Sequence, residues 1–171
     1  MSDQSAGATP DGAGQPRPTQ QPPLTVNAQY VKDFSFENPN APNSLTLRQA
    51  PQIAVNVDVK ARPIAESAYE VLLVIGAEAK HESQVAFVVE LTYGGVFTLS
   101  GIPEEHIRPI LLIECPRLLF PFARAILSEA TRDGGFPPLS LQPIDFAQLY
   151  RQQLQQRAPP LQPSTGSPPT S

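Results

Sequence analysis

Four segments of the chain alternate between apolar and polar residues, which is the two-residue period of half-buried β-strands. In the first segment, 25–36, the apolar residues occupy even positions from Val26 to Phe36, and Lys32 interrupts the row. In the next three the apolar residues occupy odd positions, over 53–61, 69–77 and 85–93. The links between the segments are short or marked by proline, so we expect a four-stranded antiparallel meander.

Helical periodicity replaces the alternation after Gly101. Pro103 and the two glutamates that follow predict a short helical or turn segment. A second helix is expected to begin near Pro116, with Pro121 in or near its first turn, and to end at Asp133-Gly134-Gly135. Its apolar residues at helical spacing are Leu119, Phe122, Ala123, Ile126 and Ala130.

Residues 136–143 carry three prolines and are expected to be extended. Asp145 is a good N-cap for a last amphipathic helix, whose apolar residues are Phe146, Leu149, Tyr150 and Leu154. Strands that precede helices predict an α+β fold, in which a long-stranded antiparallel sheet is followed by helices.

Proline marks the boundaries of the expected domain. Ten of the 21 prolines lie in 1–23 and 158–171, where large apolar residues are nearly absent. Such segments bury too little surface to offset the entropy of ordering, so we expect two disordered tails around a single domain at 24–157. The chain has 171 residues, of which 40% are hydrophobic, and this is enough for one domain with a real core.

Charge and cysteine content narrow the possible classes of protein. The formal net charge of −4 argues against nucleic-acid binding, which needs a basic surface. The first residues show no signal-peptide pattern, and the longest apolar runs are five residues, far too short to cross a membrane. A single cysteine fits a reducing compartment, so we expect a cytoplasmic protein.

Few residues could support catalysis. Cys115 follows Glu114 and lies nine residues after His106, so a nucleophile and base are conceivable, but a buried apolar role for the cysteine is favoured. His81 and His106 lie in polar surroundings and are expected to be solvated. The spacing of possible ligands offers no metal site. Gly94-Gly95 lacks the lysine of a phosphate loop and is better interpreted as a turn at a strand end.

Two features favour binding over catalysis. The extended segment and the last helix carry more large apolar residues than a small monomer buries easily, so they either pack under the sheet or contact a partner. In the first strand Asp33 and Glu37 share parity, and Glu90 has the polar parity of its own strand beside Val88 and Thr92. The parity places the acids on one outer face, which by charge alone is typical of an ordinary solvated surface.

Four blocks of sequence, in order, resemble the SecB family of bacterial preprotein-export chaperones over residues 24–157. The blocks are 32–42, 90–97, 115–124 and 135–146. The resemblance implies a homotetramer, formed as a dimer of dimers, that holds unfolded secretory preproteins without ATP and delivers them to the SecA translocase ATPase. It implies no cofactor, no metal, no enzymatic activity and no direct insertion into a membrane.

The resemblance also implies roles for individual residues. Those matching the family's binding groove for its clients, the unfolded polypeptides that it holds, are Ile53, Val55, Val57, Phe136, Leu139, Leu141, Phe146 and Leu149. Those matching the positions that engage SecA are Asp33, Glu37, Val88 and Glu90. The proline-rich C-terminal tail departs from the acid-rich tail of the family. The alternative is a chaperone of the same fold dedicated to another client, such as an antitoxin, without delivery to SecA.

Overall fold

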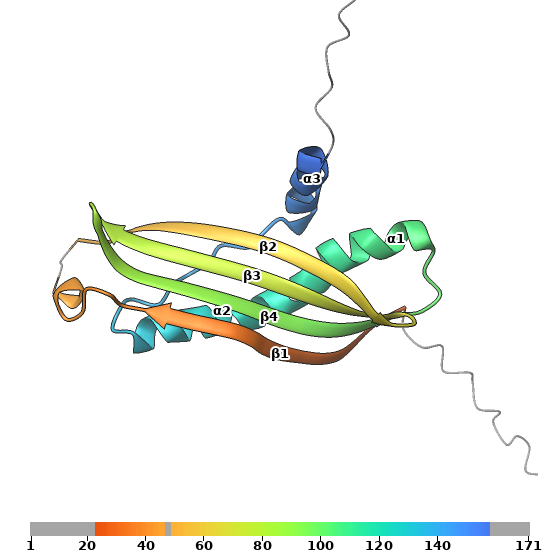
Figure 1. Ribbon diagram of the computed structural model, residues 1–171, viewed down its shortest axis with the longest axis horizontal. Coiled ribbons are helices and arrows are strands. Elements are labelled where there is room, and N and C mark those ends of the chain that lie inside the picture. The colour runs from red at the N-terminus through yellow and green to blue at the C-terminus, as the bar shows by residue number, and fades with distance from the viewer. Residues whose placement is uncertain (1–22, 47–48, 158–171) are drawn as a thin grey trace, which may run out of the picture.

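The computed structural model describes residues 23–46 and 49–157. They form one antiparallel sheet of four strands, β1 (Leu24–Glu37), β2 (Gln52–Ala65), β3 (Ala68–His81) and β4 (Gln84–Leu99), followed by helices (Figure 1). The α+β fold class expected from the sequence is confirmed. The two tails predicted to be disordered lie, apart from Pro23, outside the described residues, so that prediction stays untested.

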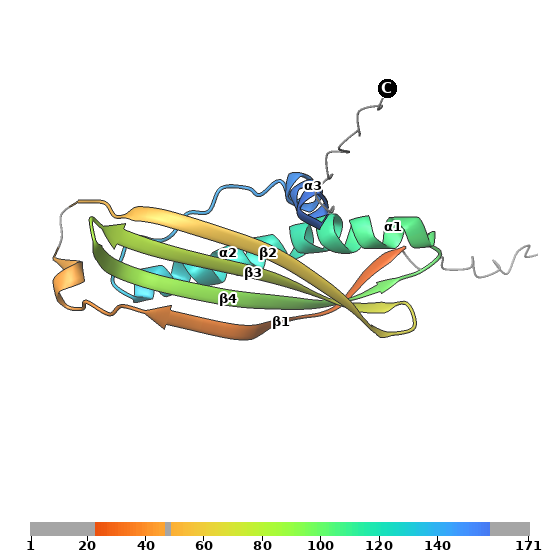
Figure 2. The same ribbon diagram turned by 45° about the horizontal axis from the view of Figure 1, so that its top comes forward.

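The strand order in the sheet is β1-β4-β3-β2. The expected meander is present from β2 to β4, whereas β1 lies beside β4 instead of beside β2. The connection between β1 and β2 contains a 3₁₀ turn, Asn43–Leu45, and is long enough to carry the chain to the opposite edge of the sheet (Figure 2). The central strands β3 and β4 place their odd-numbered apolar side chains against the helices, where they are buried.

Strand β1 changes face twice along its length. Its pairing with β4 shifts by one residue at Asn27 and again at Lys32, so each of these residues is extra relative to the partner strand. Because one extra residue reverses the alternation, Phe34 and Phe36 lie on the helix-covered inner face, whereas Ala28 and Tyr30 lie on the outer face. The expectation of a single apolar row from Val26 to Phe36 was therefore wrong.

Gly94 and Gly95 lie inside β4, so the expectation of a turn at a strand end was also wrong. A Cβ atom on Gly94 would lie 2.7 Å from the ring of Tyr30, and one on Gly95 would lie 2.9 Å from Leu119. Glycine is present here because side chains cross the strand on both faces of the sheet, not because the chain turns.

The segment from 104 to 133 is one continuous helical run. It consists of α1 (Glu104–Pro109), a π-helical turn (Ile110–Glu114) and α2 (Cys115–Asp133). The π-helical turn and α2 pack against one face of the sheet (Figure 2). The prediction of a helix beginning near Pro116 is confirmed, since α2 begins at Cys115, although it continues the π-helical turn without a break. Pro121 lies inside α2. The side chains that α2 buries completely include Leu119, Ala123 and Leu127, whereas Phe122 is 50% exposed.

After α2 the chain leaves the helix at Gly134 and runs without helix or strand to Asp145. The last helix, α3 (Phe146–Arg157), begins where the sequence predicted. A carboxylate oxygen of Asp145 accepts a hydrogen bond from the backbone N–H of Gln148 at 2.9 Å, which confirms Asp145 as the N-cap.

Candidate binding groove and docking face

An apolar groove runs between edge strand β2 and the extended segment 136–144. On the strand side, Ile53 and Val55 are 44% and 46% exposed, and Val57 is half-buried. All three lie opposite inner-face residues of β3, so their side chains point toward the helix side of the sheet. A cavity of about 450 Å³ separates them from the opposite wall, whose apolar residues are Leu139, Leu141, Pro143 and Ile144.

A second cavity of about 440 Å³ adjoins the first, because Ile53 and Leu139 line both. Phe87, Phe136 and three prolines give it apolar walls. The rings of Phe87 and Phe136 lie 4.9 Å apart between centroids, so the start of the extended segment packs directly on the sheet. The two cavities together form a continuous apolar trough along the β2 side of the molecule, which we call the β2 groove.

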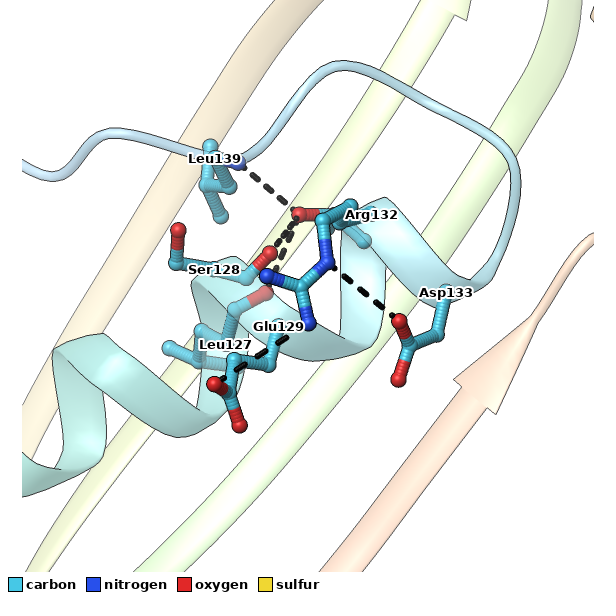
Figure 3. A network of polar contacts seen from close by, with 7 residues as sticks. Leu127, Ser128, Glu129, Arg132, Asp133 and Leu139 are labelled. Atoms are coloured by element: carbon cyan, nitrogen blue, oxygen red, sulfur yellow. Dashed lines mark hydrogen bonds and ion pairs between the residues drawn. The ribbon is translucent and has the colours of Figure 1, made fainter.

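The wall of the β2 groove is fixed by the buried hydroxyl of Thr131, which is hydrogen-bonded to Leu127, Ser128 and Leu139, three of the residues labelled in Figure 3. The hydroxyl donates toward the carbonyl oxygens of Leu127 and Ser128 and accepts a hydrogen bond of 2.8 Å from the backbone N–H of Leu139. A segment without helix or strand is thereby attached to the end of α2, and Leu139 is held over the groove. The polar group is satisfied inside the core, where an unpaired donor would be costly.

The eight residues expected to bind a client fall into three groups. Ile53, Val55 and Val57 form the open wall, while Phe136, Leu139 and Leu141 are at most 8% exposed and present only an edge to the cavities. The other two lie elsewhere: Phe146 is 1% exposed against Phe120, and Leu149 is half-buried on α3. Sequence reasoning missed Ile144, which the extended apolar segment could have suggested, and Leu45, which no sequence pattern indicated.

The outer face of the sheet brings together the four residues expected to engage a partner ATPase. Glu37 lies opposite Val88, Ser35 opposite Glu90 and Asp33 opposite Thr92, so all share one face. Asp33, Glu37 and Glu90 are exposed, and Val88 is half-buried among them. We call Asp33, Glu37, Val88 and Glu90 the acidic face. Sequence reasoning missed Glu78, which lies opposite Val88 on β3 and lines a shallow depression beside it.

Farther along the outer face, a buried carboxylate accepts hydrogen bonds from side chains of both edge strands. Glu70 is 5% exposed and accepts hydrogen bonds from the Tyr30 hydroxyl, the Lys32 ammonium at 2.8 Å and the Arg62 guanidinium. The Lys32 ammonium is the largest of the influences that lower the pKa of Glu70 to about 2. Burial, aided by the hydrogen bond to Glu70, raises the pKa of Tyr30 to about 12, so its hydroxyl remains a donor.

The described residues show little that could carry chemistry. Cys115 is fully buried, and this burial, with the adjacent charge of Glu114, raises the pKa of its thiol to about 12. Over 23–46 and 49–157, no three side chains of His, Cys, Asp or Glu gather as metal ligands would. In that same part of the chain, no helix is both long and apolar enough to span a bilayer.

Comparison with known proteins decides between the classes that this geometry allows. Residues 17–157 match the family described as preprotein translocase subunit SecB. The chain belongs to the SecB family. The protein-export protein SecB of Mesorhizobium japonicum is 61% identical over 78% of this chain and 81% of its own length, and that of Rhodospirillum centenum is 54% identical over 92% and 95%.

Among solved structures, a SecB-like chaperone of Mycobacterium tuberculosis, in complex with a peptide from the HigA1 antitoxin, has the same fold. Its TM-score is 0.61 at 15% identity, covering 71% of this chain and 90% of that one. Membership of the SecB family makes this protein a chaperone of protein export and not an enzyme.

Proposed function

We propose that this SecB protein holds unfolded preproteins in the β2 groove without nucleotide and passes them to the SecA translocase ATPase through the acidic face. It acts as a cytoplasmic homotetramer that requires no cofactor. The family supplies the export role, and the residues below are our assignment of that role to surfaces of this chain.

The β2 groove is the observation that carries the proposal. A chaperone for many clients needs a long apolar surface that accepts different side chains, not a shaped pocket with converging polar groups. Ile53 and Val55 expose nearly half of their surface beside the extended segment, although the inner faces of the central strands β3 and β4 are well buried. A protein that never bound apolar partners would gain by covering them.

The acidic face supports delivery to a basic partner. Asp33, Glu37 and Glu90 are exposed on one side of the sheet, and none of them forms an ion pair with another described residue. Unpaired surface charges of one sign steer association with a partner of the opposite sign. Because the β2 groove opens on the inner face, a client and SecA could be bound at the same time.

A second apolar surface supports the tetramer. Val31, Phe34, Leu118 and Phe122 are 42% to 50% exposed. Val31 lies opposite Tyr93, whose ring stacks on that of Phe122 at 6.4 Å, and Leu118 lies one helical turn before Phe122. We assign this patch to contact with further copies of the chain, since closed symmetry is the usual outcome for self-complementary faces.

A chaperone dedicated to an antitoxin is the second candidate. The complex of the mycobacterial chaperone with an antitoxin peptide raises it, but at 15% identity that likeness shows the fold alone. The export proteins are 52% to 61% identical to this chain, so the export role is favoured.

Alanine substitution in the β2 groove tests the proposal. The triple variant of Ile53, Val55 and Val57 should suppress aggregation of an unfolded secretory preprotein less well than wild type, without ATP in either case. The expected loss of binding free energy is roughly 25 cal/mol per Å² of apolar contact removed.

Asn56→Ala is the matched control, because Asn56 lies on the same strand but faces outward opposite Gly76. It should protect the preprotein as wild type does. Only variants with the wild-type oligomeric mass are compared. Full protection by the triple variant would place the client elsewhere and reject the groove.

A further inference from the structure

The extra residue at Lys32 determines which side chains of β1 join the acidic face. Upstream of it, Tyr30 faces outward opposite Gly94, and downstream Asp33 faces outward opposite Thr92. Tyr30, at an even position, and Asp33, at an odd position, thus share one face, which a regular strand does not allow. If the bulge moved to Phe34, Lys32 would lie opposite Thr92 and Asp33 would turn toward Leu91 on the inner face.

Apolar burial alone does not hold the bulge in place. The inner face of β1 is open on both sides of Lys32, since Val31 is 48% exposed and Phe34 is 42% exposed. The firm apolar anchor lies farther downstream, where the ring of Phe36 stacks on that of Phe87 at 5.8 Å. That anchor fixes the end of the strand and leaves the position of the extra residue to be set from the upstream side.

The Glu70 cluster, which consists of Tyr30, Lys32, Arg62 and Glu70, supplies the upstream anchor. Two of its donors, the Tyr30 hydroxyl and the Lys32 ammonium, come from β1 and meet on the same carboxylate oxygen of Glu70. Gly94 leaves room for the Tyr30 ring to cross β4 and reach β3. Moving Lys32 one residue along the strand would carry it roughly 3.4 Å away from Glu70 and break the ion pair.

We propose that Glu70, with Tyr30 and Lys32, is a positioning residue that fixes the bulge of β1 and so places Asp33 on the acidic face. The consequence for SecA rests on the proposed function of that face, whereas the placement of Asp33 does not. Glu70 is buried on the outer face of the sheet and contacts neither the β2 groove nor the acidic residues, and this role accounts for its presence there.

Disulfide trapping tests the placement. Cysteines at positions 33 and 92 lie directly opposite in the observed register, within the Cα separation that a disulfide spans. The native Cys115 is fully buried and does not compete. Adding Glu70→Gln removes charge-assisted hydrogen bonds that hold the bulge at Lys32. Because a moved bulge turns position 33 away from position 92, the yield of this disulfide should fall about fivefold. Tyr30→Phe keeps the ring, removes only the hydroxyl and should lower the yield by less.

Glu114→Gln is the matched control, because it removes a carboxylate from the exposed pair with Arg117 on the helical run. It should leave the disulfide yield unchanged. Wild-type yield in both the Glu70→Gln and Tyr30→Phe backgrounds would overturn the proposal. If Glu70→Gln does not fold, the Tyr30→Phe yield decides alone.

SecA affinity, measured in proteins without the engineered cysteines, separates this inference from the proposed function. Glu70→Gln should weaken SecA binding about as much as Asp33→Asn does. If Asp33→Asn leaves SecA binding unchanged, the docking role of the face fails, while the disulfide yield still decides where the bulge lies. If Asp33→Asn weakens binding and Glu70→Gln does not, positioning by Glu70 is rejected.

Discussion

At the scale of single residues, Glu70 links the electrostatics of the sheet to its geometry. Its carboxylate is shielded from water, yet it remains ionised because Lys32 and Arg62 neutralise it and Tyr30 donates to it. These partners lie on β1 and β2, the two edge strands, so one carboxylate on β3 ties both edges of the sheet together.

This carboxylate predicts how stability depends on pH. The pKa of Glu70 falls from its ordinary value of 4.5 to about 2 in the folded protein. Its contribution to stability is therefore fully present above pH 4.5 and is lost as the pH falls toward 2. Glu70→Gln should be less stable at neutral pH and should lose less stability over that acid range, measured by thermal unfolding at fixed protein concentration. Equal acid sensitivity in the variant and wild type would contradict the assignment.

Residue-scale prediction from the sequence succeeded where alternation is unbroken. Ile53, Val55 and Val57 follow strict parity, and the structure places them on one face. It failed where an extra residue breaks the parity, as at Lys32, because an interruption in a pattern does not say whether the strand continues or bulges. The partners of Glu70 were not foreseen either, since they come from strands whose pairing is set by the whole fold.

At the scale of elements, the helical run from 104 to 133 contains three prolines, which lack a backbone donor: Pro109, Pro116 and Pro121. Pro109 directly precedes the π-helical turn, while Pro121 lies within α2, where the carbonyl four residues earlier loses its usual partner. The sequence pattern placed Pro121 in or near the first turn of a helix, where a missing donor costs little, and made no prediction for Pro109. Packing of the buried side of the run against β3 and β4 outweighs the local preference of proline to end a helix.

Pro121→Ala should stabilise the protein, because Pro121 is exposed and the substitution restores the missing hydrogen bond. The gain should be up to about 3 kcal/mol, the usual difference between proline and alanine inside a helix. Denaturant unfolding at fixed protein concentration measures it. The control is Pro137→Ala, in the extended segment, which restores no helical bond. No gain for Pro121→Ala beyond that of the control would show that proline does not destabilise the helix at this position.

At the scale of the whole molecule, the two faces of the sheet are used differently. The inner face carries the helices and the β2 groove, and the outer face carries the exposed acids and the Glu70 cluster. The sequence predicted the fold class, the shared face of Ile53, Val55 and Val57, and the shared face of the four residues of the acidic face, because alternation and family resemblance are carried by local segments. It did not predict the strand order, which depends on the long connection that carries the chain from β1 to β2 at the opposite edge of the sheet.

Assembly is the next prediction at this scale. Four chains of 18.5 kDa should give a particle of about 74 kDa by native mass spectrometry. Phe122→Asp places a charge within the patch assigned to contact between copies and should reduce this mass. Leu154→Asp is the control, since Leu154 is a comparably exposed apolar residue on α3 outside that patch. A wild-type protein that is only monomeric at micromolar concentration would reject the tetramer.

We propose that this chaperone serves export by docking on SecA through its acidic face, and calorimetry with purified SecA measures that docking. Glu90→Lys and Asp33→Lys should leave the fold nearly intact, because surface substitutions usually change stability by about 0.5 kcal/mol or less. Both should nevertheless weaken or abolish SecA binding at low salt while retaining an unfolded client, and wild-type binding should weaken as salt increases. Wild-type SecA affinity in both variants at low salt would contradict the account and favour a chaperone dedicated to another client.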